Sequence, residues 1–540
     1  MALPPLHRRL LLTVLLPALA ATPEPASAAL PGAVEQWGVF ELALPGPTDG
    51  NPFSDVRFTT TFSDGTRAIE VAGFYDGDGV YRVRFMPDRV GAWRYTTASD
   101  RAPLHQQRGE FTVHAPSPGN HGPVRVHETY HFAYADGTAY RPFGTTCYTW
   151  THRPEWIEEQ TLRTLAASPF NKLRMCVFPQ SHAVKAMPPP RFPFEGEPHR
   201  WDFTRFNPDF FRHLEGRIAQ LRDLGIECDL ILFHPYDNGH WGFDQMDAAS
   251  DERYLRYLIA RLAAYRNVWW SLANEYDFLT TKTEARWDRL FQVVQASDPH
   301  DHLRSIHNGN LFYNHTHPWV THVSMQNGPA VEDPTRAETY RRAYRKPVVY
   351  DEVQYEGNHP QRWGALGARE FVHRVWSGTV AGTYVGHGEY FVAPDDVTWL
   401  GEGGELKGES PPRIAFLRKL LEDGPPHIDP IDRWRDASQG GRPGEYYLMY
   451  FGREAPTSWP FQLYRHRLVD GMEFAVDLID PWEMTITPVS GSFVTKERDR
   501  YTFVDRDGRR VPLPGKPCQA LRIRRVGGAV PPAVDAAPTP

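Results

Sequence analysis

The chain has 540 residues, of which 41% are hydrophobic and 13% aromatic, and this length predicts more than one domain. Its formal charge of -7 comes from 59 basic and 66 acidic residues without a long run of either sign. This balance argues against a polyanionic partner such as nucleic acid, and a neutral partner fits it better.

Residues 1–28 have the pattern of a signal peptide. Two arginines precede an apolar stretch from Leu10 to Ala21, and an A-x-A cleavage site ends at Ala28. That stretch is too short to span a bilayer, and no later segment approaches the roughly 20 apolar residues that a membrane helix needs. We therefore expect a secreted or periplasmic protein, cleaved near Ala28, with no membrane contact afterwards.

Residues 35–115 are predicted to form an N-terminal β-sandwich. Short runs of alternating polar and apolar residues are separated there by turn sequences such as SDG and YDGDG, a spacing typical of antiparallel sheets. The sequence APSPGNHGP, residues 115–123, follows and indicates a linker.

Residues 124–425 show a different pattern, in which short buried strands alternate with amphipathic helices, for example at 208–225 and 251–266. Eight such units over about 280 residues predict a (β/α)8 TIM barrel. A doubly wound sheet is the rival fold, but no Gly-rich phosphate loop follows the first strand. The expected strands cover residues 141–147, 171–178, 226–233, 267–274, 303–308, 321–326, 347–352 and 381–388.

Strand patterns return at residues 430–526, which predict a small C-terminal β-domain, and residues 527–540 are expected to be a disordered tail. The four cysteines lack C-x-x-C spacing, and the first three lie in strand-like apolar runs. Buried thiols are therefore favoured over a zinc site or a disulfide framework, and no cofactor is predicted. These cysteines are Cys147, Cys176, Cys228 and Cys518.

Two glutamates stand where an apolar strand meets a loop. Asn274-Glu275 ends the fourth expected strand, and Glu352 ends the seventh. Active sites of barrel enzymes lie at this end of the strands, and cleavage of a glycosidic bond requires a pair of carboxyl groups. Either glutamate alone could equally be a salt-bridged or helix-capping group, but their joint placement favours catalysis.

This arrangement resembles the retaining barrel glycosidases grouped as clan A, in which Asn-Glu ends strand four and a second Glu ends strand seven. The resemblance implies that Glu275 is the general acid/base, Glu352 the nucleophile, and Asn274 a partner of the sugar 2-hydroxyl. A general acid must hold its proton, and a nearby carboxylate helps Glu275 to do so.

A second resemblance extends over residues 35 to 425. The sequences GHGEYF (386–391), GGELKGESPPRIAFLRKLLEDGP (403–425) and KPVVYDEVQYEG look like a bacterial barrel family related to the apiosidase-like glycosidases. The front sequences EQWGVFEL, NPFSDV and YRVRFMPDRVGAWRY are similar to the sandwich module that precedes those barrels. This resemblance implies the fold and a carbohydrate substrate without identifying the sugar.

Further polar and aromatic residues near the expected strand ends are candidates for substrate binding. Each could instead fix a loop or fill the core, and for the carboxylates Glu389, Asp237 and Asp351 a structural role is the stronger expectation. The candidates are Arg174, His234, Tyr236, His307, Asn308, Gln326, His387 and Glu389, with Trp150, Trp241 and Trp399 as stacking platforms.

Two other functions compete with a retaining glycosidase. One is a glycan-binding barrel without activity, although both glutamates are present. The other is a metal-dependent barrel hydrolase, suggested by His315 and His317 in H-x-H spacing; such a pair belongs on the first strand, whereas here it follows the fifth. The long loop from Pro179 to Pro208 favours exo action on short oligosaccharides. The sugar, the linkage and the oligomeric state stay open.

Overall fold

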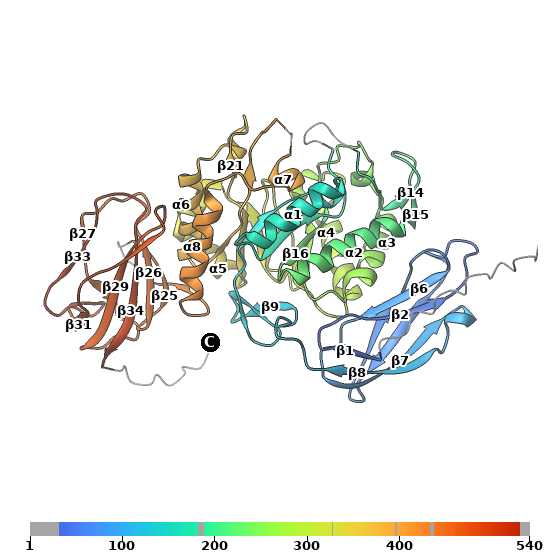
Figure 1. The fold of residues 1–540 in the computed structure, drawn as a ribbon, viewed down its shortest axis with the longest axis horizontal. Helices are drawn as coiled ribbons and strands as arrows, with labels where there is room; N and C mark the ends of the chain where they lie inside the picture. Colours follow the sequence, from blue (N-terminus) through green and yellow to red (C-terminus); the bar gives the residue numbers. More distant parts are fainter. Residues whose placement is uncertain (1–31, 182–187, 327, 395–396, 432–436, 530–540) are drawn as a thin grey trace, which may run out of the picture.

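The computed structural model describes residues 32–181, 188–326, 328–394, 397–431 and 437–529. It is a mixed α/β structure in which two β-rich regions flank a central region of strands and helices (Figure 1). The predicted signal peptide lies outside the described residues.

The N-terminal region consists of two sheets that face each other. One has the strand order β1-β8-β7-β3-β4 and the other β2-β6-β5. The rings of Phe62 and Phe85, one from each sheet, stack with centroids 4.3 Å apart, and aromatic side chains fill the rest of this core. The strands are β1 (Ala33–Glu35), β2 (Phe40–Pro45), β3 (Phe58–Ser63), β4 (Ala68–Ala72), β5 (Phe74–Tyr75), β6 (Val80–Phe85), β7 (Gly91–Ser99) and β8 (Arg108–His114).

Buried charges attach this region to the central one. Arg84 of β6 donates to Glu215 at 3.0 Å, and Arg261 donates to Asp76 at 2.8 Å. All four side chains are buried. Because a buried charge is tolerated only when it is paired, these contacts fix the position of the N-terminal sheets against the helices.

The central region holds eight parallel strands in two sheets, with the orders β12-β13-β16-β17-β18 and β19-β20-β22. The amide of Thr321 donates to Arg304 O at 2.9 Å, and the amide of His387 donates to Gly144 O at 2.7 Å. Main-chain hydrogen bonds thus join the two sheets along both edges. The strands are β12 (Gly144–Thr146), β13 (Lys172–Cys176), β16 (Glu227–Phe233), β17 (Val268–Ala273), β18 (Arg304–Ser305), β19 (Val323–Gln326), β20 (Val348–Glu352) and β22 (Tyr384–Val385).

Helices follow these strands and pack on their outer face. Several begin at a side chain that accepts a hydrogen bond from the first turn, as Asn207 and Asp247 do. The helix expected at 251–266 therefore starts earlier, at Ala248, and ends at Leu262. The helices are α1 (Glu155–Ala167), α2 (Pro208–Asp223), α3 (Ala248–Leu262), α4 (Glu284–Ser297), α5 (Pro334–Tyr344), α6 (Ala368–Val380), α7 (Trp399–Glu402) and α8 (Ser410–Glu422).

Shorter elements lie in the connecting loops. They are the strands β14 (Phe194–Glu195), β15 (Asp202–Phe206), β21 (Glu356–Gly357) and β23 (Glu389–Tyr390), and the 3-10 turns η1 (Ala102–Leu104), η2 (Trp150–His152), η3 (Phe243–Gln245), η4 (Tyr276–Phe278), η5 (Gly328–Glu332) and η6 (Arg362–Gly364).

A three-stranded antiparallel sheet, which the sequence patterns did not reveal, precedes the first parallel strand. It consists of β9 (Val124–His127), β10 (His131–Tyr134) and β11 (Ala139–Tyr140). Phe132 of β10 packs against Trp269 and Tyr384, which lie at the amino ends of β17 and β22. The small sheet therefore covers the amino ends of the central strands and leaves the carboxyl ends for a site.

The C-terminal region is a large antiparallel sheet with the order β24-β25-β26-β34-β29-β31-β32-β28. Tyr446 and Leu448 of β26 pack in one core cluster with residues of α6 and α8. The last strand continues to Gly528, so the tail expected to begin at residue 527 was placed too early. The strands are β24 (Asp429–Pro430), β25 (Ser438–Arg442), β26 (Tyr446–Tyr450), β27 (Ser458–Pro460), β28 (Gln462–Tyr464), β29 (Met472–Asp480), β30 (Thr485–Pro488), β31 (Phe493–Glu497), β32 (Thr502–Asp505), β33 (Arg510–Pro512) and β34 (Ala520–Gly528).

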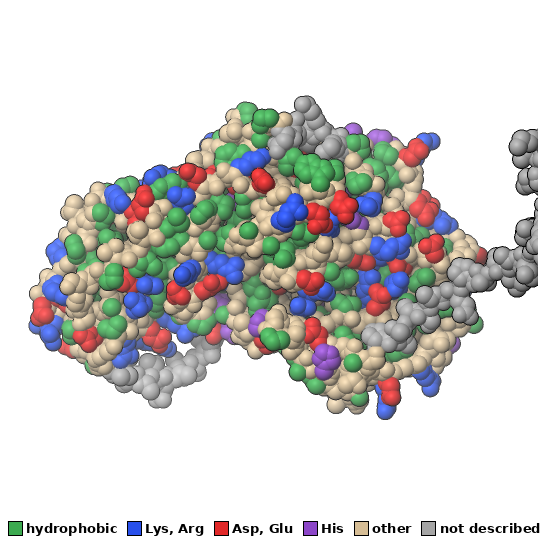
Figure 2. Space-filling model, in the orientation of Figure 1, with side chains coloured by type: hydrophobic (Ala, Val, Ile, Leu, Met, Phe, Trp, Pro, Cys, Tyr) green, Lys and Arg blue, Asp and Glu red, His purple; other side chains and the backbone are tan. Residues whose placement is uncertain are grey.

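The surface mixes charges of both signs. On the face shown in Figure 2, acidic and basic side chains alternate without an extended area of one sign. Among the described residues, no helix is long and apolar enough to cross a membrane. Cys147, Cys176 and Cys228 are buried as free thiols, and Cys518 is a free, half-buried thiol.

Candidate active site

Glu275 and Glu352 lie at the carboxyl ends of two parallel strands. Glu352 is the last residue of β20, and Asn274-Glu275 directly follows β17. Glu275 adopts a left-handed backbone conformation with φ 44°. A non-glycine residue in this region is strained, and such strain is common at functional sites.

Glu352 is buried among groups that stabilise its charge. Its Oε1 accepts a hydrogen bond from the Tyr148 hydroxyl at 2.5 Å and one from Arg174 at 3.4 Å, and His307 Nε2 lies 3.4 Å away. Burial alone would raise the pKa of Glu352, but His307, Arg174 and the hydrogen bonds from Tyr148 and Tyr355 together hold it below its ordinary value. Glu352 is therefore ionised at neutral pH.

Glu275 is half-buried, and no Lys or Arg of the described residues forms an ion pair with it. Its carboxyl oxygens accept hydrogen bonds from the Tyr236 hydroxyl at 2.5 Å and from the Gln326 amide at 2.9 Å. Burial, and next the charge of Glu352, raise the pKa of Glu275 to about 7. One carboxyl of the pair therefore keeps its proton near neutrality while the other does not.

A chain of hydrogen bonds connects the two carboxyl groups. Asn274 donates to the Tyr236 hydroxyl at 2.6 Å and accepts from Arg174 at 2.7 Å. Tyr236 in turn donates to Glu275, and Arg174 to Glu352. Because the Asn274 oxygen faces Arg174, its amide has one possible orientation. The predicted set of Asn274, Arg174 and Tyr236 therefore meets at the glutamate pair.

A buried network of charges lies beneath Glu352. Lys172 forms ion pairs with Asp229 at 2.6 Å and with Asp351 at 2.8 Å. Asp351 also accepts from the Ser324 hydroxyl at 2.5 Å, and Ser324 contacts His307 Nδ1 at 3.1 Å. The expectation of a structural role for Asp351 fits these contacts.

His307 is a neutral imidazole in this network. Burial, and then the charge of Arg174, lower its pKa to about 4. The Ser324 proton points to Asp351, so the Ser324 oxygen accepts from His307 Nδ1–H. At neutral pH, Arg174 therefore supplies the permanent positive charge beside the nucleophile candidate.

The remaining polar candidates have defined partners close to the pair. His234 Nε2 contacts Phe178 O at 3.0 Å, and its Nδ1 accepts from the Tyr236 amide at 3.2 Å, so it fixes the loop that carries Tyr236. Asn308 donates to Gly309 O at 3.2 Å. Gln326, the last residue of β19, donates to the same oxygen at 2.9 Å, which ties the loop after β18 to the end of β19.

The three tryptophans proposed as stacking platforms are all buried. Trp150 and Trp399 expose 0% and 1% of their surface, and Trp241 exposes 5%. Trp150 Nε1 contacts the sulfur of Met175 at 3.3 Å, and Trp399 Nε1 donates to Thr145 at 2.8 Å. In this conformation they fill the core, the alternative that their sequence left open, and they offer no open face to a sugar.

His387 and Glu389 are also buried. Glu389 accepts hydrogen bonds from the amides of Lys407 at 2.5 Å and Gly408 at 2.9 Å, and burial raises its pKa to about 7. His387 Nδ1 contacts the Thr145 hydroxyl at 2.9 Å. These contacts of both side chains are within the protein, and their contact with substrate stays a prediction.

The sequence reasoning missed several groups that surround the pair. Tyr148 directly follows the first expected strand, so the rule that site residues stand at strand ends could have identified it. Lys172 and Ser324 point inward from the first and the second position of their strands, a direction that no local pattern gives. Tyr355 lies beyond the seventh strand, where its burial depends on the fold.

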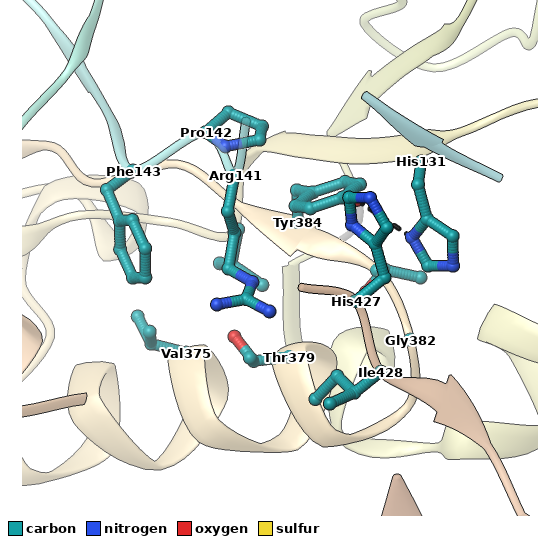
Figure 3. A pocket seen from close by; sticks show the side chains of 12 residues that line it. His131, Arg141, Pro142, Phe143, Val375, Thr379, Gly382, Tyr384, His427 and Ile428 are labelled. Carbon is teal, nitrogen blue, oxygen red and sulfur yellow. Dashed lines mark hydrogen bonds between the residues drawn. The ribbon is translucent and has the colours of Figure 1, made fainter. Parts of the chain in front are cut away.

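A separate pocket lies at the opposite end of the central strands (Figure 3). Arg141 precedes β12, and the rings of His131 and His427 stack with centroids 4.4 Å apart. Catalytic residues of parallel barrels lie at the carboxyl ends of the strands, so this pocket is distinct from the glutamate pair.

Within the described part of the chain, His315 and His317 do not belong to a group of potential metal ligands. His315 is buried beside Tyr344, and His317 stacks on Trp319. Among the described residues, three or more ligand-type side chains come within metal-binding reach only at Glu356, His387 and Glu389.

Comparisons with known proteins identify the class. The model of an apiosidase-like catalytic domain matches residues 126–390. Models of two domains of unknown function, DUF5060 and DUF5605, match residues 33–100 and 434–524. No curated protein matches the chain.

Solved structures agree with the domain match. An inferred glycoside hydrolase from Bacteroides vulgatus ATCC 8482 is 42% identical, with a TM-score of 0.89 over 92% of this chain and 100% of that one. A family 5 glycoside hydrolase from the same organism is 16% identical, with a TM-score of 0.57 over 76% of this chain and 94% of that one, and shares the fold. Both of these similar structures are described as glycoside hydrolases. The chain belongs to the apiosidase-like glycoside hydrolases.

Proposed function

We propose that this protein is a retaining glycoside hydrolase that cleaves O-glycosidic bonds of an extracellular or periplasmic glycan or oligosaccharide. The catalytic unit is a (β/α)8 barrel of residues 124–425, with a β-sandwich of residues 35–115 in front and a β-domain of residues 430–526 behind. The two β-domains pack against the barrel and perform no chemistry. The signal peptide directs export and is cleaved near Ala28.

The observation that carries the proposal is the different environment of the two carboxyl groups. Glu352 is held as an anion by Arg174 and Tyr148, whereas Glu275 keeps a proton near pH 7. Two carboxyl groups with separated pKa values are what a retaining glycosidase needs.

In the first step, Glu352 attacks the anomeric carbon as the bond to the leaving oxygen breaks. The proton of Glu275 passes to that oxygen, and the sugar remains bound to Glu352 as an ester. Arg174 and Tyr148 hold the attacking carboxylate in place. Consumption of the Glu352 charge removes one cause of the raised pKa of Glu275, so this group can now lose its proton.

In the second step, the Glu275 carboxylate takes a proton from water, and the water oxygen attacks the anomeric carbon. Glu352 leaves as a carboxylate, and two inversions give net retention. Asn274 is positioned beside both glutamates and is our candidate for binding the sugar 2-hydroxyl. Exo action stays a prediction, because residues 182–187 of the loop that suggested it lie outside the described residues.

The test is a screen of the purified protein, beside Glu352→Ala, against aryl pyranosides and furanosides and against plant and bacterial glycans. Turnover lost in the variant supports the proposal and identifies the sugar. Proton NMR of the first product formed then reads its anomeric configuration, and retention is expected. Turnover that survives in Glu352→Ala would refute the assigned nucleophile, an inverted product would refute the double displacement, and sugar binding without turnover would favour the binding-protein alternative.

A further inference from the structure

A second group of side chains with potential metal ligands lies near the glutamate pair. Glu356 of β21 and Glu389 of β23 are direct partners in a parallel strand pair, and His387 stands two residues before Glu389. Since side chains two residues apart lie on the same face of an extended chain, the three point to one side. Their candidate ligand atoms all lie within 4.8 Å of one another.

The two carboxylates of this group lack a strong cationic partner. Glu356 and Glu389 expose 2% and 1% of their surface. Among the described residues, no Lys or Arg forms an ion pair with either carboxylate. The charge of Lys407 acts on Glu389 only from beyond ion-pair distance, and His387 Nε2 lies 3.9 Å from Glu389 Oε2. Adjacent buried carboxylates repel each other unless a cation or a proton lies between them.

Main-chain amides already orient both carboxylates. Glu389 binds the amides of Lys407 and Gly408, and Glu356 binds those of Glu409 at 2.7 Å and Ser410 at 3.1 Å. These amides belong to the loop that leads into α8. Each carboxylate oxygen accepts one such bond and retains further lone pairs, so the group is held in place with acceptor capacity unused.

His387 gives an independent indication of a ligand. Its side chain is 1% exposed, and its Nε2 has no hydrogen-bond partner among the described residues. On the other side of the ring, Nδ1 lies 2.9 Å from the Thr145 hydroxyl. A histidine that binds a metal through one nitrogen ordinarily donates the other N–H to an oxygen in this way.

We infer that Glu356, His387 and Glu389 form a binding site for one divalent transition-metal ion of the zinc type. One imidazole nitrogen with two carboxylate oxygens suits Zn²⁺, while calcium and magnesium prefer oxygen ligands alone. The ion balances the charge of the two carboxylates and ties the loop of residues 407–410, and with it the start of α8, to the strand end at Glu389. Its role is structural, and the reaction at Glu275 and Glu352 does not require it.

The test uses the full protein without a histidine tag, stripped with dipicolinate and titrated with Zn²⁺ by calorimetry. We expect one tight equivalent per chain and a Tm that rises with added Zn²⁺. His387→Gln and Glu389→Gln should both lose the tight site and the rise in Tm. His359→Ala is the matched control, because this half-buried imidazole lies against Tyr390 but outside the group, and it should bind Zn²⁺ as the unchanged protein does.

Anomalous diffraction from crystals of the unchanged protein grown with Zn²⁺ locates the ion without relying on the folding of a variant. An anomalous peak at the zinc edge among the three side chains supports the site. No tight binding by the unchanged protein, tight binding that survives in both variants, or a peak only at other histidines would overturn it. In that case a proton shared by the two carboxylates balances their charge. None of these readings uses catalytic activity, so they are independent of the proposed reaction.

Discussion

Two pairs of glutamates lie at or beyond the carboxyl ends of the central strands, and the two pairs differ in the groups that contact them. Glu275 and Glu352 are contacted by side chains, and each has its own set of partners. Glu356 and Glu389 are contacted by consecutive main-chain amides and share one type of environment. Side-chain contacts that differ between two carboxyl groups separate their pKa values.

Acid–base chemistry requires two carboxyl groups with different contacts. A general acid and a nucleophile must differ in protonation at the same pH, and only the first pair has the asymmetric contacts for this. The second pair connects the strands β21 and β23 to the residues that lead into α8. Substitutions that break one pair should therefore change catalysis, and those that break the other should change stability.

The largest effect is expected from Glu275→Gln. The amide cannot donate the proton that a poor leaving group needs, so kcat/KM for a natural glycoside should fall by about 10² to 10⁴-fold. An aryl glycoside with a good leaving group should lose much less, because its departure needs no proton.

The same substitution in the second pair, Glu356→Gln, should affect hydrolysis far less than Glu275→Gln does on the same natural glycoside. Steady-state kinetics on both substrates measure the difference. Equal losses on the two substrates in Glu275→Gln would contradict the acid role.

The second prediction concerns Arg174, whose charge distinguishes the first pair from the second. Arg174→Gln leaves Asp351, Asp229 and Glu352 with less compensating charge, and removal of one partner of a buried ion pair typically costs about 3 to 5 kcal/mol. Denaturant unfolding measures this loss. Arg200→Gln, which removes an exposed ion pair with Glu197, should be nearly neutral, and a similar small effect at Arg174 would show that the network does not stabilise the fold.

Much of the fold and the pair itself could be predicted from the sequence, because these features are local. The end of a strand and the periodicity of a helix can be recognised from neighbouring residues. Glu275 and Glu352 each stand at the end of an apolar run. The rule that the carboxyl ends of parallel strands meet also placed Asn274, Arg174 and Tyr236 at the same mouth, as candidates for substrate binding.

The supporting contacts could not be predicted, because they join distant parts of the chain. Lys172 and Asp351 are 179 residues apart, and no pattern near either one indicates the other. The tryptophans illustrate the same limit, since an aromatic residue near a strand end has the same local sequence whether it faces a groove or the core. Glu356 was not recognised, because its contacts come from the amides of residues 53 and 54 positions further on.

The third prediction addresses the second pair through Gly408. A Cβ added at this glycine would lie 2.5 Å from Oε2 of both Glu356 and Glu389, too close for either carboxylate to stay in place. Gly408→Ala should therefore destabilise the protein by about 1 to 3 kcal/mol, measured by denaturant unfolding, while the kinetics of the Glu275 and Glu352 pair persist.

Gly216→Ala is the matched control for this substitution. Gly216 lies inside α2 with nothing within 4 Å of an added Cβ. Alanine favours a helix by up to about 1 kcal/mol over glycine, so the control should be stabilised. The same sign of effect in both variants would show that contact with the carboxylates is not the cause.

The smallest effect, and the one that most directly probes the asymmetry, is a shift in the pH profile. The reaction needs Glu275 protonated, so kcat/KM should fall as pH rises through its pKa of about 7. The Tyr236 hydroxyl stabilises the Glu275 anion and lowers this pKa. Tyr236→Phe should therefore raise the pKa and move the alkaline limb to higher pH, by about half a unit to one unit.

Tyr148→Phe is the counterpart on the other member of the pair. Tyr148 stabilises the Glu352 anion, so its removal should raise the pKa of Glu352 and move the acid limb to higher pH. Because the two carboxyl groups titrate together, the limbs report apparent values, and the informative quantity is which limb moves more in each variant. If both variants moved the same limb, the two glutamates would not have the separate roles that their contacts assign, and the difference between the two pairs would need another explanation.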